Sequence, residues 1–85
     1  MSLLVKICGL STPETVDAAI EQGATHIGLV HFEPSPRHVD LKTAAELRKR
    51  AGRHVQVALL LVNASQQLTA EALAAVRPDI IQFHG

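Results

Sequence analysis

Hydrophobic residues gather in four short runs that are separated by segments with helical periodicity. The runs are rich in Val, Ile and Leu and have the length of single buried strands. They predict strands over residues 3–7, 26–31, 55–62 and 79–83. Because nearly every position in a run is apolar, rather than every second one, the strands are expected to be buried on both faces.

Between the strands, apolar residues recur at three- and four-residue intervals, as on one side of a helix. Val16, Ala19 and Ile20 show this spacing in the first such segment. Each segment also begins with residues suited to a helix start and ends at a glycine or before a proline. These boundaries are Ser11–Glu14 with Gly23, Asp40 with Gly52, and Asn63–Ser65 with Pro78.

The predicted order is therefore β-α-β-α-β-α-β. Apolar strands joined by helical crossovers indicate an α/β fold with a parallel β-sheet. Such crossovers are expected to be right-handed. No linker or change of composition marks a boundary, so residues 1–85 are expected to form one unit.

Composition and charge exclude several classes of protein. Of the 85 residues 47% are hydrophobic, yet Phe32 and Phe83 are the only aromatic ones. Eight basic and eight acidic side chains give zero net charge. This balance argues against electrostatic capture of nucleic acid, and neither Trp nor Tyr is present to stack on bases. A single cysteine, Cys8, leaves no internal disulfide and no cysteine-cluster zinc site.

No apolar run approaches the length of a membrane span. The start of the chain, residues 1–6, has no basic segment ahead of its apolar one, and Lys6 interrupts it early. It is therefore not read as a secretory signal. A cytoplasmic protein is expected.

Polar or reactive residues follow all four predicted strands. Cys8 comes after the first, a loop with Arg37 after the second, Asn63 after the third and His84 after the fourth. In parallel α/β folds, ligands bind beyond the carboxyl ends of the strands. The opposite ends carry ordinary cap and turn residues. This asymmetry predicts a functional site at the carboxyl edge of the sheet.

Each of these residues also has a purely structural interpretation. A cysteine after a buried strand is often an inert small hydrophobe, and an arginine in a proline-rich loop is often solvated. His31, His38 and His84 lack the spacing of metal ligands, so no metal site is predicted. The single glycine in the turn over residues 8–11 is no phosphate-binding fingerprint.

The strand-end segments nevertheless resemble one known family. Four of them occur in the order and spacing of the amino-terminal half of phosphoribosylanthranilate isomerase, a TIM-barrel, or (βα)8-barrel, enzyme of tryptophan biosynthesis: Lys6–Leu10, Ser35–Arg37, Val62–Ser65 and Gln82–Gly85. The resemblance covers the whole chain. Two positions depart from the family pattern: Leu60-Leu61, where an aromatic residue is frequent, and Phe83, where leucine is more usual.

The resemblance implies an Amadori rearrangement without any cofactor. A general acid opens the ribose ring of N-(5-phosphoribosyl)anthranilate to a Schiff base, and a general base takes the proton from the adjacent carbon. Cys8 matches the family's base, and Arg37 the arginine near the anthranilate carboxylate. His84 matches a substrate-binding position. Asn63 is a weaker binding candidate that also suits a cap of the third helix. Lys6 is expected to point away from this chemistry.

The resemblance also implies parts that these 85 residues lack. The family's general acid lies on a later strand and its phosphate site follows the seventh and eighth, whereas a full barrel needs roughly 200 residues or more. The chain is thus predicted to form strands one to four of a TIM barrel, a partial domain incompetent alone, which pairs with another copy or with the missing half. Two alternatives stay open: a non-catalytic half-barrel or flavodoxin-like module that binds a ligand or self-associates, and another phosphosugar barrel enzyme.

Overall fold

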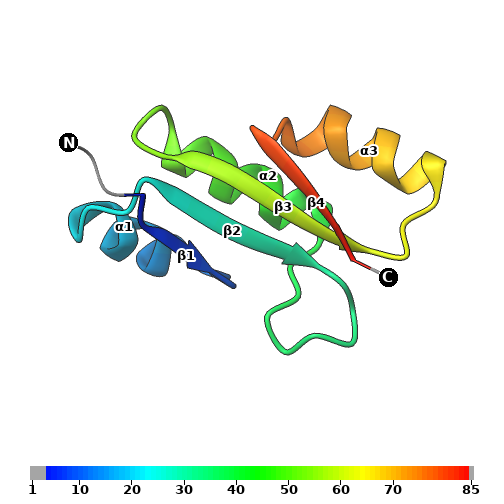
Figure 1. Cartoon of the computed structure of the whole chain (residues 1–85), viewed down its shortest axis with the longest axis horizontal. Helices are drawn as coiled ribbons and strands as arrows, with labels where there is room; N and C mark the ends of the chain where they lie inside the picture. The colour runs from blue at the N-terminus through cyan, green and yellow to red at the C-terminus, as the bar shows by residue number, and fades with distance from the viewer. Residues whose placement is uncertain (1–3, 85) are drawn as a thin grey trace.

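The computed structural model describes residues 4–84, in which strands and helices alternate as predicted (Figure 1). The elements are β1 (Lys6–Cys8), α1 (Pro13–Glu21), β2 (His26–His31), α2 (Leu41–Ala51), β3 (Gln56–Val62), α3 (Gln66–Val76) and β4 (Ile80–His84). The sequence pattern located every element, and the predicted bounds of β2 are the observed ones.

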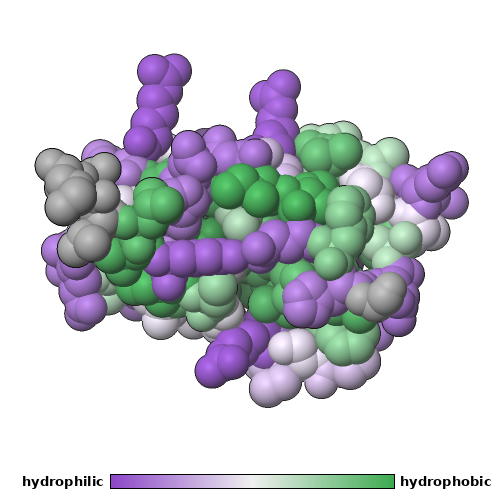
Figure 2. All heavy atoms as spheres, in the orientation of Figure 1, coloured by the Kyte–Doolittle hydropathy of each residue, from purple (hydrophilic) through white to green (hydrophobic). Residues whose placement is uncertain are grey.

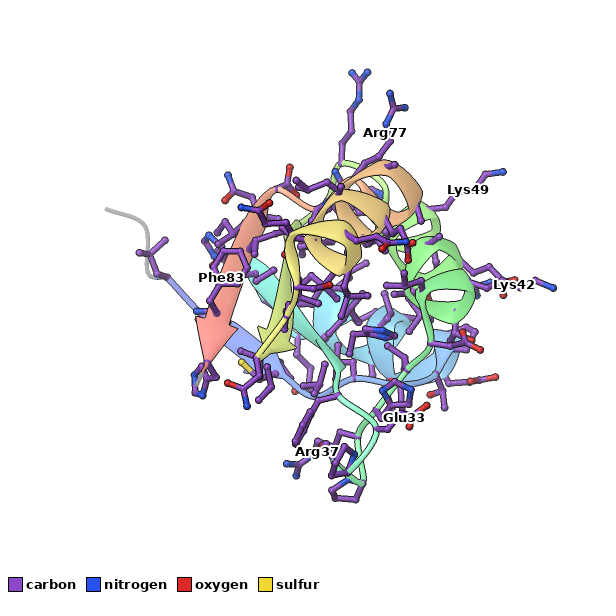
Figure 3. The ribbon with its side chains drawn as sticks, turned by 90° about the vertical axis from the view of Figure 1, so that its right-hand side faces the viewer. Glu33, Arg37, Lys42, Lys49, Arg77 and Phe83 are labelled. Carbon is purple, nitrogen blue, oxygen red and sulfur yellow. The ribbon has the colours of Figure 1, made fainter. Side chains whose placement is uncertain are left out.

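The four strands form one parallel sheet in the order β1-β2-β3-β4. Each strand thus pairs with its neighbour in sequence, and one row of partners runs from Cys8 through Gly28 and Ala58 to Ile80. In Figure 3 the strands lie on one side and the helices on the other, which makes two layers. All four carboxyl ends therefore meet at one edge, as the predicted α/β fold requires.

The core lies between the sheet and the helices. In the central strands most residues that face the helices are buried, and Leu29 and Leu59 are 0% exposed. The helices contribute mostly small or aliphatic side chains to this layer: Val16, Ala19, Ala44, Leu47, Ala51, Ala72 and Val76. Alanine at the contact lets helix and sheet approach closely, which explains a core built almost without aromatic residues.

Burial on both faces is confirmed only in part. The central strands β2 and β3 are mostly buried, but β1 and β4 are largely exposed. The helices cover one face of the sheet, and within residues 4–84 no second layer covers the other, here called the open face. Figure 2 looks onto it and shows hydrophobic atoms interrupted by hydrophilic ones. The prediction was wrong for the edge strands because a continuous apolar run does not show which layers are present.

The helix starts follow the predicted chemistry, with small shifts. The Thr12 side chain accepts a hydrogen bond from the Thr15 N–H, and Asp40 and Ser65 make equivalent caps. Ser65, and not Asn63, therefore caps α3. No helix within residues 4–84 has both the length and the apolar character needed to cross a membrane.

Asp79 ties the amino end of β4 to the amino end of β3 and to Arg48 of α2. Its carboxylate accepts a hydrogen bond from the Val57 N–H at 2.8 Å and lies 3.4 Å from a guanidinium nitrogen of Arg48. Arg48 also donates to the main-chain oxygens of Gly52 and Arg77. Asp79 is thus a structural residue at the edge opposite the predicted site.

Candidate functional site

The predicted site residues lie at the carboxyl edge of the sheet. Cys8 is the last residue of β1, rather than the residue after it, and its side chain is exposed. Gly28 on β2 leaves room for it, since a Cβ at that position would lie 3.1 Å from the Cys8 sulfur. The thiol therefore lies on the open face, beside a strand that carries no side chain at that point.

Lys6 was predicted to point away from Cys8, and this prediction was wrong. Side chains alternate along a strand, so residues 6 and 8 share a face. The Lys6 ammonium donates a hydrogen bond of 2.8 Å to the side-chain oxygen of Gln82. This bond spans the open face from β1 to β4, the two edge strands of the sheet. The sheet is therefore curved, with its open face concave.

The same contact places His84. β1 and β4 run in the same direction, and on the open face Lys6 is followed two residues later by Cys8 and Gln82 by His84. The fold thus brings a thiol and an imidazole to the same end of the concave face. His84 is the last residue of β4 and is exposed.

Arg37 reaches the site from the loop between β2 and α2. Figure 3, seen from the end toward which the strands point, shows this loop with Arg37 and Glu33 beyond the sheet. The Arg37 side chain packs on the main chain of Gly9, so closely that a Cβ there would overlap it. Gly9 also has a φ of +78°, which favours glycine. The guanidinium stem therefore lies against the residue that follows Cys8.

Asn63 contributes through its main chain. Its N–H donates a 2.9 Å hydrogen bond to the carbonyl of His84, and its φ of 50° is left-handed. Asparagine tolerates this conformation better than most residues. Asn63 thus joins the carboxyl ends of β3 and β4 and turns the chain toward α3.

No strand residue in the described sheet is an acid, so the concave face carries a thiol, an ammonium and imidazoles but no carboxyl group. The carboxyl groups with lowered pKa values lie elsewhere. Hydrogen bonds from Thr43 lower the pKa of Asp40, the cap of α2, and the Arg50 guanidinium lowers that of Asp17. Within residues 4–84 no three His, Cys, Asp or Glu side chains are grouped to hold a metal ion.

Comparison with known proteins decides the family. The family profile described as N-(5'-phosphoribosyl)anthranilate (PRA) isomerase matches residues 5–85. The chain belongs to this family. A relative of that name from Erythrobacter litoralis is 58% identical over 96% of the chain, and one from Afipia carboxidovorans is 55% identical over 100% of it. The chain spans 39% and 36% of the length of these two relatives.

Solved structures of the family agree with the fold. The isomerase from Thermotoga maritima superposes with a TM-score of 0.92 at 25% identity, covering 99% of this chain and 41% of that one. A family structure in complex with reduced 1-(o-carboxyphenylamino)-1-deoxyribulose 5-phosphate gives the same TM-score and identity, with 43% of its length covered. The four parallel strands and their helices are therefore the counterpart of less than half of these PRA isomerase structures.

Proposed function

We propose that this chain supplies the amino-terminal half of the catalytic barrel of a phosphoribosylanthranilate isomerase. The reaction converts N-(5-phosphoribosyl)anthranilate to 1-(2-carboxyphenylamino)-1-deoxyribulose 5-phosphate, a step of tryptophan biosynthesis. The observation that carries the proposal is the exposed Cys8 at the carboxyl end of β1, with Arg37 packed on the adjacent Gly9. Family membership over residues 5–85 supports it.

Cys8 acts as the general base in this proposal. Once the ribose ring has opened to a protonated Schiff base, the proton on the adjacent carbon is acidic, and the Cys8 thiolate removes it to give an enolamine. Tautomerisation of the enolamine yields the ketose. The thiolate, and not the thiol, accepts the proton. The exposure of Cys8 on the concave face gives a substrate direct access to it.

Arg37 binds the anthranilate carboxylate in this proposal. A guanidinium presents two parallel N–H groups, which match the two oxygens of a carboxylate and orient the ring attached to it. His84, on the same face as Cys8, is assigned to substrate binding and orientation. Asn63 contributes by holding the turn after β3 and, through it, the end of β4.

We further propose that residues 1–85 are a partial domain whose partner is the rest of the barrel, or failing that a second copy. Within residues 4–84 nothing covers the concave face. A second apolar surface lies between α3 and β4, where Phe83 is 62% and Leu73 is 49% exposed. The general acid and the phosphate site come from the partner. A soluble phosphosugar of amino-acid biosynthesis as substrate favours a cytoplasmic location.

The test is reconstitution. The purified chain is assayed for isomerisation of phosphoribosylanthranilate alone and after mixing with the carboxyl-terminal remainder of the Erythrobacter litoralis relative; this mixture is the reconstituted barrel below. Turnover is expected only in the mixture. The Cys8→Ser variant is expected to abolish turnover, because the hydroxyl is far less acidic than a thiol, while leaving complex formation intact.

Two results would contradict the proposal. Undiminished turnover by the Cys8→Ser mixture would remove Cys8 from the role of base. A stable complex without turnover by the unmodified chain would favour the alternative, a binding or assembly module without catalysis. Sedimentation velocity of each mixture separates a failure of assembly from a failure of chemistry.

A further inference from the structure

The loop that carries Arg37 is built from two consecutive turns. The Ser35 N–H donates to the Phe32 carbonyl at 2.8 Å, and the His38 N–H donates to the Ser35 carbonyl at 3.1 Å. The Ser35 hydroxyl also accepts a 3.1 Å hydrogen bond from the Arg37 N–H. These bonds give the loop its shape, but they do not fix where it lies relative to the sheet.

The loop is attached to the sheet where it ends, at the buried Val39. The Val39 N–H donates a 2.8 Å hydrogen bond to the carbonyl of Val30 on β2. The Val39 carbonyl lies 2.8 Å from Nδ1 of His31, the last residue of β2. A carbonyl oxygen only accepts, so His31 Nδ1 carries the proton and donates it. Both main-chain polar groups of Val39 are thus bound to the end of β2.

A second contact joins His31 to the loop. The rings of His31 and His38 lie with their centroids 5.0 Å apart and their planes tilted by 40°. Within the described residues, Nδ1 of His38 is buried without a hydrogen-bond partner. The His38 ring is therefore oriented by packing, and His31 is part of that packing. Because His38 directly follows Arg37, this contact helps to set the position of the Arg37 main chain.

We infer that His31 is a positioning residue that holds Arg37 beside Cys8. Its side chain contacts two consecutive residues at the end of the loop, His38 through ring packing and Val39 through a hydrogen bond. Residue 31 has the same orientation on β2 as the buried Ile27 and Leu29, toward the helices, so it does not reach the concave face. This inference rests on the proposed role of Arg37 in binding the substrate carboxylate.

The single thiol makes a direct test possible in the 85-residue chain. The Cys8 thiolate attacks one sulfur of an aromatic disulfide, forms a mixed disulfide and releases the other half as a thiolate. Two such reagents differ in charge: 5,5'-dithiobis(2-nitrobenzoate) carries aromatic carboxylates, and 4,4'-dithiodipyridine is uncharged. The ratio of their rate constants at low salt reports a cation beside Cys8. One guanidinium about 7 Å from one carboxylate in water changes this ratio about threefold.

Three variants read out the inference. Arg37→Gln removes the cation and is expected to lower the ratio about threefold. His31→Phe keeps a ring against His38 but cannot donate to the Val39 carbonyl, and it is expected to lower the ratio at least twofold. His31→Asn places an amide N–H near the position of Nδ1 and is expected to keep the ratio of the unmodified chain. Far-UV circular dichroism accompanies each measurement.

An unchanged ratio in folded His31→Phe, with a lowered one in Arg37→Gln, would overturn the role of His31 and leave that of Arg37 standing. An unchanged ratio in Arg37→Gln would overturn the placement of Arg37 beside Cys8, and the inference with it. If His31→Phe does not fold, His31→Gln replaces it, because its longer side chain carries the amide past the Nδ1 position. None of these results depends on turnover, which the Cys8→Ser reconstitution tests separately.

Discussion

Gly9→Ala is expected to displace the Arg37 side chain from the site while leaving Arg37 and Cys8 themselves unchanged in the sequence. A methyl group at Gly9 would overlap Cδ of Arg37 and approach its Nε to 2.9 Å. The arginine stem is flexible, so it moves rather than the strand. Gly23→Ala is the matched control: Gly23 has a φ of +87°, but a methyl group there meets no atom within 4 Å.

Both variants are expected to lose stability, but only one of them is expected to lose affinity for a ligand carboxylate. Alanine with positive φ costs about 1–2 kcal/mol in either place, which lowers the Tm of a domain of this size by about 5–15 °C. Only Gly9→Ala also disturbs the contact that Arg37 makes with a ligand carboxylate. A hydrogen-bonded contact to a charged group contributes about 1.5–3 kcal/mol, so its loss weakens binding about 10- to 150-fold.

The assay is calorimetric titration of the reconstituted barrel with reduced 1-(o-carboxyphenylamino)-1-deoxyribulose 5-phosphate. Thermal unfolding of each variant, followed by circular dichroism, measures the shared cost. The expected result is a similar loss of Tm in both variants and weakened binding in Gly9→Ala alone. Ligand affinities that agree within a factor of two would refute the reasoning, because they would show that the position of Arg37 over Gly9 does not matter for the carboxylate.

Three other perturbations test the core, the cap and the open surface. Leu47 is 2% exposed, and Leu47→Ala is expected to lower the free energy of unfolding, measured in urea, by about 2–5 kcal/mol. Leu73 is 49% exposed, so Leu73→Ala is expected to lower it much less. Equal losses in the two variants would contradict the described core. The hydrogen bond from the Thr43 N–H lowers the pKa of Asp40 below its usual value of 3.8, so this cap stabilises the fold above pH 3.8 and the stabilisation is lost as the pH falls through the lower pKa of the folded state. Asp40→Asn is therefore expected to reduce the loss of stability in this acid range. An unchanged pH dependence of unfolding in that range would contradict the expectation. Phe83→Ser is expected to weaken assembly with the complementary half in sedimentation, and an unaltered complex would show that the surface beside α3 stays open.

Much of the fold followed from the sequence because its signals are local. Val16, Ala19 and Ile20 show the helical period within one turn, and neither the cap at Asp40 nor the helix end before Pro78 requires knowledge of other segments. The alternation of strands and helices then restricts the topology to a parallel sheet. The element order and the carboxyl edge with Cys8 were therefore predictable.

Features that depend on contacts between residues distant in sequence could not be predicted in this way. The bond between Lys6 and Gln82 exists because the sheet curves, and no local pattern reveals curvature. The attachment of the loop at Val39 is likewise a tertiary contact. The two-residue period of a strand does indicate that Lys6 and Cys8 share a face, so the prediction that Lys6 points away from Cys8 was avoidable.

The strand order has a consequence for how the chain folds during synthesis. Partners in the sheet are close in sequence: residues 8 and 28 differ by 20 positions, 28 and 58 by 30, and 58 and 80 by 22. Each strand therefore finds its partner already synthesised, and no pairing waits for a distant segment. Each of these separations is the length of one helical crossover, so the sheet can grow stepwise although every pairing must close a loop of that length. A nascent chain is expected to add one strand and helix at a time as it leaves the ribosome, with β4 as the growing edge.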